Sequence, residues 1–391
     1  MTKVLEGVKV VELGTMITAP LAAMMLADLG ADVVKVENPQ GGDPFRSFRG
    51  GHYSPHFFAY NRGKRSINLD LRQEAGKEVL RKLLADADIL IENYRSGVMD
   101  RLGFSRASLE AINPRLIHCS ITGFGPTGPY SQRPAYDSVG LALSGISSLL
   151  LDPEEPQVCG PTIPDNATGM FACYGILGAL YERERTGKGR FVELNMLEAS
   201  IAFIPDPFAN YTMLGIDNQP LTRVASSHSF AFRCADGKLL AIHLSSQTKF
   251  WDGLLRVAER TDLNDDPRFS TREARIAHFA ELTQTLASVF VTRERGVWMA
   301  LLEAQDVPFA PVHSIPEVID DPQVRHLESF RTLHHPTLGD LFATRRPLRI
   351  DGGRDGSDLA APVLGEHTDE VLAELGYSAS EIASKRAAKA I

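Results

Sequence analysis

The chain has 391 residues, of which 43% are hydrophobic and 23% charged, a composition typical of a globular enzyme and not of a disordered or fibrous protein. Its formal net charge of −8 argues against nonspecific nucleic-acid binding, although a local cluster of Lys and Arg can still hold a small anion. We also expect no signal peptide, because charged residues interrupt the opening MTKVLEGVKVVELG, and no membrane-spanning helix, because no apolar run approaches the roughly 20 residues required.

Strand-like and helix-like segments alternate through the first third of the chain. The strands are predicted over residues 8–13, 31–37, 65–71, 88–93 and 116–125. Strands separated by single helices imply right-handed crossovers, so we predict an α/β fold built on a mostly parallel, doubly wound sheet.

The pattern changes after about residue 200. Two alternating runs flank Asp236 and Gly237 within residues 229–245, which predicts a β-hairpin, and helical patterns follow it. We therefore predict a large domain over residues 1–200, a linker over 201–225, a smaller α+β domain over 226–325, and a return to the large domain over 326–391.

Several common catalytic motifs are missing. Gly14 ends the first strand, but no second glycine follows in the turn, so the G-x-G-x-x-G approach to a pyrophosphate is not available. No G-x-S-x-G nucleophile elbow occurs, and the histidines lack metal-ligand spacing, so we expect no metal site. The four cysteines are far apart, which favours reduced thiols in a cytoplasmic protein; they are Cys119, Cys159, Cys173 and Cys234.

A basic cluster lies near the ends of the predicted strands, where open α/β sheets bind ligands. A guanidinium group can donate two hydrogen bonds to a phosphate, so this cluster is compatible with a phosphate-bearing cofactor. For any single member, a solvated charged face is the simpler interpretation. The cluster comprises Arg62, Lys64, Arg65, Arg72, Arg95 and Arg101.

The segment IPDNATGMFACYGILGALYERERTGKG, residues 163–189, predicts an almost wholly apolar helix that begins on Asp165. Asp165 can serve as the N-cap of this helix, or as a nucleophile held ionised by the positive helix terminus. Both interpretations use the same electrostatics, so both remain open.

Two stripes of residues follow the length of this helix, and they lead us to expect packing on both faces. The large stripe is Met170, Tyr174, Leu177 and Tyr181, and the small one is Thr168, Ala172, Gly175 and Ala179. The glycines inside the helix each cost about 1 kcal/mol relative to Ala, so we expect a neighbouring backbone to approach closely there. These glycines are Gly169, Gly175 and Gly178.

Several blocks in order resemble the family III CoA-transferases, whose superfamily includes formyl-CoA transferase, carnitine CoA-transferase and α-methylacyl-CoA racemase. The resemblance implies a Rossmann-like domain with a second smaller domain, in an interlocked homodimer. It also implies acyl-CoA and a small carboxylic acid as substrates, with no tightly bound cofactor. The blocks are LEGVKVVELGTMITAPLAAMMLADLGADVVKVE, GGDPFR, NRGKRSINLDL, ADILIENYRSGVMDRLGF, NPRLIHCSITGFGPTGP, DNATGMFACYGILGALYERERTGKG and APVLGEHTDEVLAELG.

The same resemblance implies roles for individual residues. The aspartate nucleophile of the family falls on Asp165. The CoA-contacting positions fall on Ile17, Thr18, Asn38, Leu69, Asp70, Leu71, Arg72, Asn93, Tyr94, Arg95, Arg101, Pro134, Ala135, Tyr136 and Asp137.

Two positions narrow the expected chemistry. The racemase uses a His where this chain has Tyr136, and a phenol, which ordinarily titrates near a pKa of about 10, is a poor base at neutral pH. Ile17 replaces the glutamine of the formyl-CoA enzyme, and the segment PLTRVASSHSFAFRC replaces its glycine-run loop. We therefore do not expect formyl-CoA or oxalate as substrates. The apolar Ile17 leaves room for a larger acyl chain.

We therefore expect CoA transfer through an aspartyl mixed anhydride and an aspartyl-CoA thioester. A 2-methylacyl-CoA racemase and a non-catalytic CoA-binding protein are the alternatives.

Overall fold

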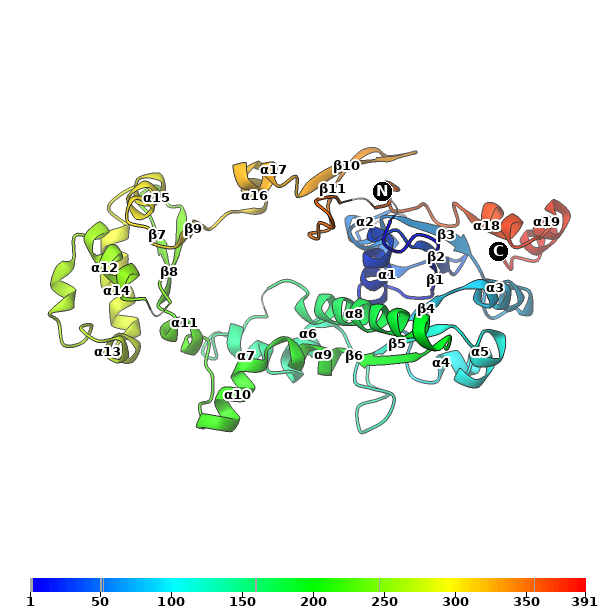
Figure 1. Cartoon of the computed structure of the whole chain (residues 1–391), viewed down its shortest axis with the longest axis horizontal. Helices are drawn as coiled ribbons and strands as arrows, with labels where there is room; N and C mark the ends of the chain where they lie inside the picture. The colour runs from blue at the N-terminus through cyan, green and yellow to red at the C-terminus, as the bar shows by residue number, and fades with distance from the viewer. Residues whose placement is uncertain (1–2, 50, 52, 159, 246, 355) are drawn as a thin grey trace. The chain divides into compact units, whose positions relative to one another are not determined.

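The structure of the protein is a computed structural model. It describes residues 3–49, 51, 53–158, 160–245, 247–354 and 356–391. Cys159 lies outside these residues, whereas Cys119, Cys173 and Cys234 are free and buried. The chain divides into two compact units: one comprises Met1–Ser147, Val158–Pro205 and Glu328–Ile391, and the other comprises Ser148–Gln157 and Asp206–Leu327 (Figure 1).

A six-stranded parallel sheet forms the centre of the first unit. The strand order is β3-β2-β1-β4-β5-β6, and every pair of neighbours is parallel. The first five strands correspond to the predicted ones, whereas β6 was not predicted. The strands are β1 (Lys9–Glu12), β2 (Asp32–Glu37), β3 (Lys64–Asn68), β4 (Ile89–Glu92), β5 (Ile117–Thr122) and β6 (Phe191–Asn195).

Helices cover both faces of this sheet, which explains why its strands are rich in Val and Ile. On one face, Val10, Ile89 and Ile117 pack against α1 (Thr18–Asp28) and α8 (Ile163–Thr186). On the other, Val11 and Leu90 pack against α3 (Glu74–Asp86), α5 (Arg106–Ile112), α18 (Thr368–Glu374) and α19 (Ala379–Ala387).

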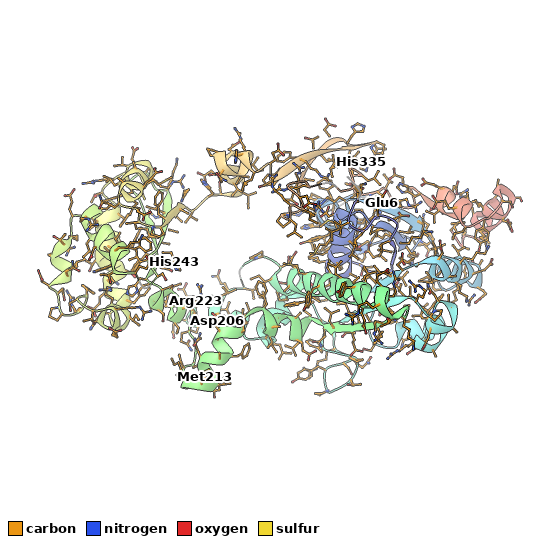
Figure 2. The ribbon with its side chains drawn as sticks, viewed as in Figure 1. Glu6, Asp206, Met213, Arg223, His243 and His335 are labelled. Carbon is orange, nitrogen blue, oxygen red and sulfur yellow. The ribbon has the colours of Figure 1, made fainter. Side chains whose placement is uncertain are left out.

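Shorter elements complete this part of the chain. They are η1 (Pro44–Ser47), α2 (Pro55–Asn61), α4 (Val98–Leu102), α6 (Asp137–Leu143), α7 (Ile146–Leu150), α9 (Met196–Phe203) and the hairpin β10 (Phe330–His335) and β11 (Gly339–Thr344). His335 of this hairpin, labelled in Figure 2, is buried. Its ring contacts that of Tyr53.

The second unit is built on a small antiparallel sheet, β7 (Ser229–Arg233), β8 (Leu239–His243) and β9 (Phe309–Pro311). The predicted hairpin is confirmed, and Gly237 in its turn has a φ of +75°. Its core is aromatic, with Phe232 stacked on Phe290.

The rest of this unit is largely helical. Its helices are α10 (Pro205–Leu214), α11 (Thr222–Ser226), α12 (Thr248–Val257), η2 (Thr261–Asn264), α13 (Arg272–Ala277), α14 (Phe279–Phe290), α15 (Arg295–Ala304), α16 (Ile315–Asp320) and α17 (Pro322–His326). Helices α11 to α15 supply residues to the core of the sheet. Residues 201–225, expected as a linker, thus contain α10 and parts of α9 and α11. Among the described residues, no helix is both long and apolar enough to span a bilayer.

Candidate active site

Asp165 is the third residue of α8 and not its N-cap. The cap position is Thr162, whose side chain makes no capping hydrogen bond, and Pro164 occupies the first turn. Proline fits there because the missing N–H would have no acceptor within the helix. The predicted N-cap role of Asp165 is therefore wrong, and the carboxylate is not used to cap the helix.

A second carboxylate lies beside Asp165. The backbone N–H of Asp165 donates a hydrogen bond to Oδ1 of Asp137, at 3.2 Å. Asp137 is the first residue of α6, which packs against α8. Among the described residues, no side chain or backbone group donates a hydrogen bond to the Asp165 carboxylate.

Burial and the charge of Asp137 together raise the pKa of Asp165 to about 7. Burial raises the pKa because it disfavours the charged form, and the neighbouring carboxylate adds like-charge repulsion. The helix terminus was expected to keep Asp165 ionised, but these two effects outweigh it below neutral pH. The carboxylate therefore changes its charge close to pH 7, within the range where catalytic groups commonly titrate.

Glycine in α8 permits a close approach to α1 next to this carboxylate. A Cβ on Gly169 would lie 2.8 Å from the carbonyl oxygen of Thr18, so the expected backbone contact is confirmed there. A Cβ on Gly175 would meet only a side-chain atom of Val192, at 3.0 Å, and one on Gly178 would meet no described atom within 4 Å. The expectation of a neighbouring backbone is therefore wrong at Gly175 and at Gly178.

The prediction that both faces of α8 are packed is not met by the described residues of this chain alone. Tyr174 and Tyr181 are 76% and 70% exposed, and Met170 is 52% exposed. An apolar cavity of about 300 Å³ opens on this face and is lined by Ala167, Met170, Phe171, Tyr174 and Phe203. An apolar side chain or acyl chain can therefore be accommodated within a turn of Asp165.

The candidate CoA-contacting residues follow the carboxyl ends of five adjacent strands. Parallel strands present these ends at one edge of a sheet, so loops distant in sequence meet there. Ile17 and Thr18 follow β1, Asn38 follows β2, Leu69, Asp70, Leu71 and Arg72 follow β3, Asn93, Tyr94, Arg95 and Arg101 follow β4, and Pro134, Ala135, Tyr136 and Asp137 follow β5.

Asn93 joins the loops after β1 and β4. Its Oδ1 accepts from the N–H of Thr15 at 2.9 Å, and its Nδ2 donates to Thr15 O at 2.8 Å and to Thr18 Oγ1 at 2.9 Å. Asn93 therefore binds the loop after β1 through the backbone of Thr15 and the side chain of Thr18.

Arg72 joins the loops after β2 and β3. Its guanidinium donates to both carboxylate oxygens of Asp70 and to Oε1 of Gln40, yet the side chain stays 69% exposed. This bonding holds the pKa of the Asp70 carboxyl far below its usual range. The exposed guanidinium remains accessible to an anion at the edge of the sheet.

The exposure of the other candidates varies. Ile17, Leu69 and Asp70 are buried, and Ile17 packs with Phe45 and Phe57. Asn38, Arg95, Arg101, Pro134 and Tyr136 are exposed. A cavity of about 180 Å³ with Tyr94, Arg95 and Thr122 in its wall lies beyond β4 and β5.

The phosphate-binding interpretation is wrong for half of the basic cluster. Arg62 pairs with Asp28 at 2.5 Å, Lys64 with Glu12 at 2.7 Å, and Arg65 with Asp32 at 2.6 Å. Lys64 and Arg65 also begin β3 and so lie at the opposite end of that strand from Arg72. Among the described residues, no group of three or more His, Cys, Asp or Glu side chains could hold a metal ion.

The sequence has known relatives that cover nearly all of it. The model of the family described as CoA-transferase family III matches residues 5–368. The chain belongs to CoA-transferase family III. The resemblance noted in the sequence is confirmed, and the chain is a family III CoA-transferase, an enzyme whose family acts on CoA thioesters.

Several named family members are similar over most of their length. The mouse (Mus musculus) succinyl-CoA:glutarate CoA-transferase is 32% identical over 95% of this chain and 86% of its own. The succinyl-CoA–D-citramalate CoA-transferase of Chloroflexus aurantiacus is 31% identical over 99% and 98% of the two chains. The formyl-CoA:oxalate CoA-transferase of Streptomyces avermitilis is 34% identical over 98% of each.

The fold of the chain matches that of a protein whose crystal structure is known. A CAIB/BAIF family protein from Brucella suis superimposes with a TM-score of 0.85, at 34% identity, over 95% of this chain and 99% of that one. The mixed α/β fold with its six-stranded parallel sheet thus matches the fold of that CAIB/BAIF family protein.

Proposed function

We propose that this chain transfers CoA from an acyl-CoA donor to a carboxylic acid, with Asp165 as the nucleophile. The observation that carries the proposal is the state of the Asp165 carboxylate. It lies in the first turn of α8, is partly buried beside Asp137, and has a pKa raised to about 7. A buried carboxylate whose negative charge is not balanced by a nearby cation or hydrogen-bond donor is a stronger base than a solvated one. It is therefore also a better nucleophile once it is ionised.

The proposed reaction needs no ATP, because each bond broken is replaced by one of similar energy. A carboxylate oxygen of Asp165 attacks the thioester carbonyl, the C–S bond breaks, and CoA thiolate leaves a mixed anhydride. The thiolate attacks the aspartyl carbonyl and releases the donor acid, leaving an aspartyl-CoA thioester. The acceptor carboxylate attacks that thioester and releases the thiolate, which takes the acceptor acyl group and frees Asp165.

We propose that the residues named above at the carboxyl edge bind CoA, with Arg72 and Arg101 on its phosphates. The strand order β3-β2-β1-β4-β5-β6 supports this, because it is the order of Rossmann-like sheets, which bind nucleotides where the connections reverse direction between β1 and β4. Asn93 ties together the loops of those two strands. Binding energy from the distant phosphates would then orient the thioester at Asp165.

The proposed acceptor is a short apolar or hydroxylated dicarboxylate. The names of the mouse and Chloroflexus relatives specify glutarate and D-citramalate, and the apolar cavity beside α8 suits a carbon chain. Formyl or oxalate chemistry is not part of the proposal.

We also propose that the protein is cytoplasmic and forms an interlocked homodimer. The domain limits that we propose are those predicted from the sequence: a large domain over residues 1–200 and 326–391, a linker over 201–225 and a small domain over 226–325. The exposed stripe Met170, Tyr174 and Tyr181 supports an interface on α8, because exposed apolar patches commonly mark protein contacts. The helix α10 likewise buries none of its residues, and Met213 is exposed (Figure 2).

Trapping the covalent intermediate tests the proposed nucleophile. The protein is incubated with acyl-CoA and quenched with hydroxylamine or borohydride, and modification of Asp165 is sought by mass spectrometry. Asp165→Ala should abolish CoA exchange and leave CoA binding nearly intact. Turnover by that variant would refute the assignment, and incorporation of solvent deuterium at the α-carbon without an acceptor acid would identify a racemase instead.

A further inference from the structure

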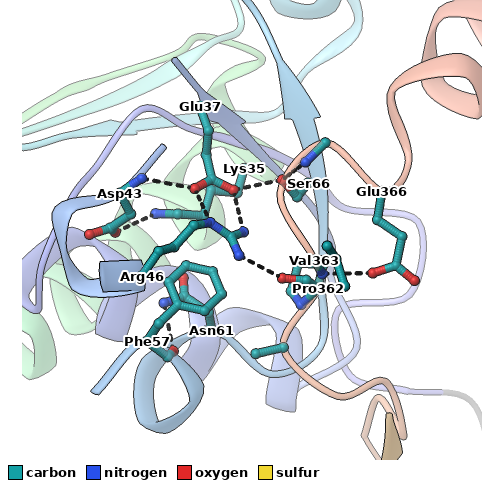
Figure 3. Close-up of polar contacts among 12 residues, drawn as sticks. Lys35, Glu37, Asp43, Arg46, Phe57, Asn61, Ser66, Pro362, Val363 and Glu366 are labelled. Carbon is teal, nitrogen blue, oxygen red and sulfur yellow. Dashed lines mark hydrogen bonds and ion pairs between the residues drawn. The ribbon is translucent and has the colours of Figure 1, made fainter. Parts of the chain in front are cut away.

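A buried network of charged side chains lies on the α1 face of the sheet, and Figure 3 shows four of its members, Lys35, Glu37, Asp43 and Arg46. It holds three cations and three carboxylates, and each side chain is at most 2% exposed. Ion pairs link them: Lys35–Glu12 at 2.9 Å, Lys35–Asp43 at 3.1 Å, Arg46–Glu37 at 2.7 Å and Lys64–Glu12 at 2.7 Å.

Such a network is weak evidence for stability. Removing each charge from water costs several kcal/mol, and buried pairs can often be replaced by apolar residues without loss. A role for the network is better sought in the backbone groups that its members hold in place.

Two of its members bind the backbone of the loop formed by residues 14–18. Lys35 Nζ donates to the carbonyl oxygen of Gly14 at 2.8 Å. The carboxylate of Asp43 accepts from the N–H of Met16, at 3.1 Å and 3.2 Å to its two oxygens. The bond at Met16 joins residues 27 positions apart in sequence.

Met16 adopts a backbone conformation that a side chain normally disfavours. Its φ is +66°, in the left-handed region where a non-glycine residue costs on the order of 1 kcal/mol. The negative charge of Asp43 offsets this cost because it holds the Met16 N–H in place. Glu12 and Asp43 outweigh burial and raise the pKa of Lys35, so the cation beside Asp43 stays charged.

The loop held in this way touches the helix that carries Asp165. The carbonyl oxygen of Thr18 faces Gly169, where a Cβ would be only 2.8 Å away, and Gly169 is one helical turn beyond Asp165. A change in the loop would therefore alter what lies next to the nucleophile.

We infer that Asp43 is a positioning residue that holds the loop of residues 14–18 against the start of α8 through the N–H of Met16. The inference rests on the proposed function, in which this loop contacts the CoA thioester beside Asp165. Asp43 does not touch the substrate in this scheme, and it acts only through the conformation of the loop.

Asp43→Asn is the direct test. Oδ1 of Asp43 faces the N–H groups of Met16 and Phe45, and Oδ2 faces the N–H of Met16 and Nζ of Lys35. The NH₂ of Asn must therefore face a donor in either orientation, which weakens the hold on Met16. We expect amide hydrogen exchange in the loop to become at least about tenfold faster and kcat to fall about tenfold, while the Kd for CoA changes less than about threefold.

A second substitution separates positioning from general damage. Glycine adopts a positive φ readily, so Met16→Gly in the Asp43→Asn background should restore kcat to within about threefold of wild type. The matched control is Asp28→Asn, which breaks another buried pair, with Arg62. It should lower the melting temperature and leave kcat and loop exchange unchanged.

Several results would overturn the inference: wild-type kcat or unchanged loop exchange in Asp43→Asn, or no recovery in the double variant. If Asp43→Asn does not fold, Met16→Val and Met16→Gly are compared alone. Valine should lower kcat several-fold more than glycine, because a β-branched residue resists positive φ, and equal values would overturn the inference. Absence of an aspartyl adduct in the wild type would refute the proposed function instead, whereas loop exchange would still decide the role of Asp43.

Discussion

The backbone N–H of Asp165 donates to Oδ1 of Asp137 at 3.2 Å, so two carboxylates share the start of α8. The hydrogen bond lowers the pKa of Asp137, but burial outweighs it and leaves that pKa raised above its usual value. The pKa of Asp165, which receives no such bond among the described residues, is raised further, to about 7. The pair therefore sets the pH at which the Asp165 carboxyl loses its proton.

Asp137→Asn should shift the pH dependence of transfer. Removing the neighbouring charge should lower the pKa of Asp165, because an ionised carboxylate no longer repels it, while burial still keeps that pKa above its usual value. The acid limb of kcat/KM, expected near pH 7 in the wild type, should therefore move to lower pH. An unchanged midpoint, measured between about pH 5 and 9, would mean that Asp137 does not act on the titrating group.

Asp165→Asn should stabilise the protein at alkaline pH. The folded-state pKa of about 7 lies above the ordinary value of 3.8, so the folded chain binds the proton more tightly than the unfolded chain. The contribution of this proton to the free energy of unfolding is fully present below about pH 4 and is lost as the pH rises through 7. A neutral amide avoids the loss, and the variant should gain about 1–3 kcal/mol relative to wild type between pH 4 and pH 8. Denaturant unfolding at both pH values measures the gain, and a pH-independent difference would contradict it.

Strands β1, β2 and β4 could be predicted because each is a short, mostly buried run that contains neighbouring Val, Ile or Leu residues. β6 could not, since Phe191–Asn195 directly precedes α9 and its pattern is mixed. The start of α8 was misplaced because Asp is a common N-cap, whereas here Pro164 lies in the first turn and the helix begins two residues before Asp165.

Side-chain roles were harder to predict than strands. The burial of Arg62 and Lys64 could not be predicted, because their ion-pair partners are far away in the sequence. Arg62 pairs with Asp28, and Lys64 pairs with Glu12. The positioning role of Asp43 could not be predicted, although the residue lies in the block GGDPFR, because it depends on the backbone N–H of Met16, a non-glycine residue whose positive φ the sequence does not reveal. Asp165 could be singled out because one acid opens an apolar helix, and because the family resemblance places the nucleophile at that position.

Two glycines of α8 should respond oppositely to alanine. Gly169→Ala places a methyl group 2.8 Å from the Thr18 carbonyl oxygen and should cost about 1–3 kcal/mol, together with activity, as α1 and α8 are forced apart. Gly178→Ala meets no described atom within 4 Å and should gain about 0.5–1 kcal/mol from helix propensity. Equilibrium unfolding of both variants checks the contrast, which would fail if the two changes had the same sign.

Two arginines of the predicted basic cluster should separate stability from CoA binding. Arg62→Gln leaves Asp28 buried without its cation and should cost about 3–5 kcal/mol, with no change in KM for acyl-CoA in the protein that folds. Arg101→Gln removes an exposed guanidinium, so the melting temperature should stay the same while KM rises about tenfold and loses part of its salt dependence. An unchanged KM in Arg101→Gln would remove that residue from the phosphate site. A raised KM in Arg62→Gln would show that the buried pair shapes the site after all.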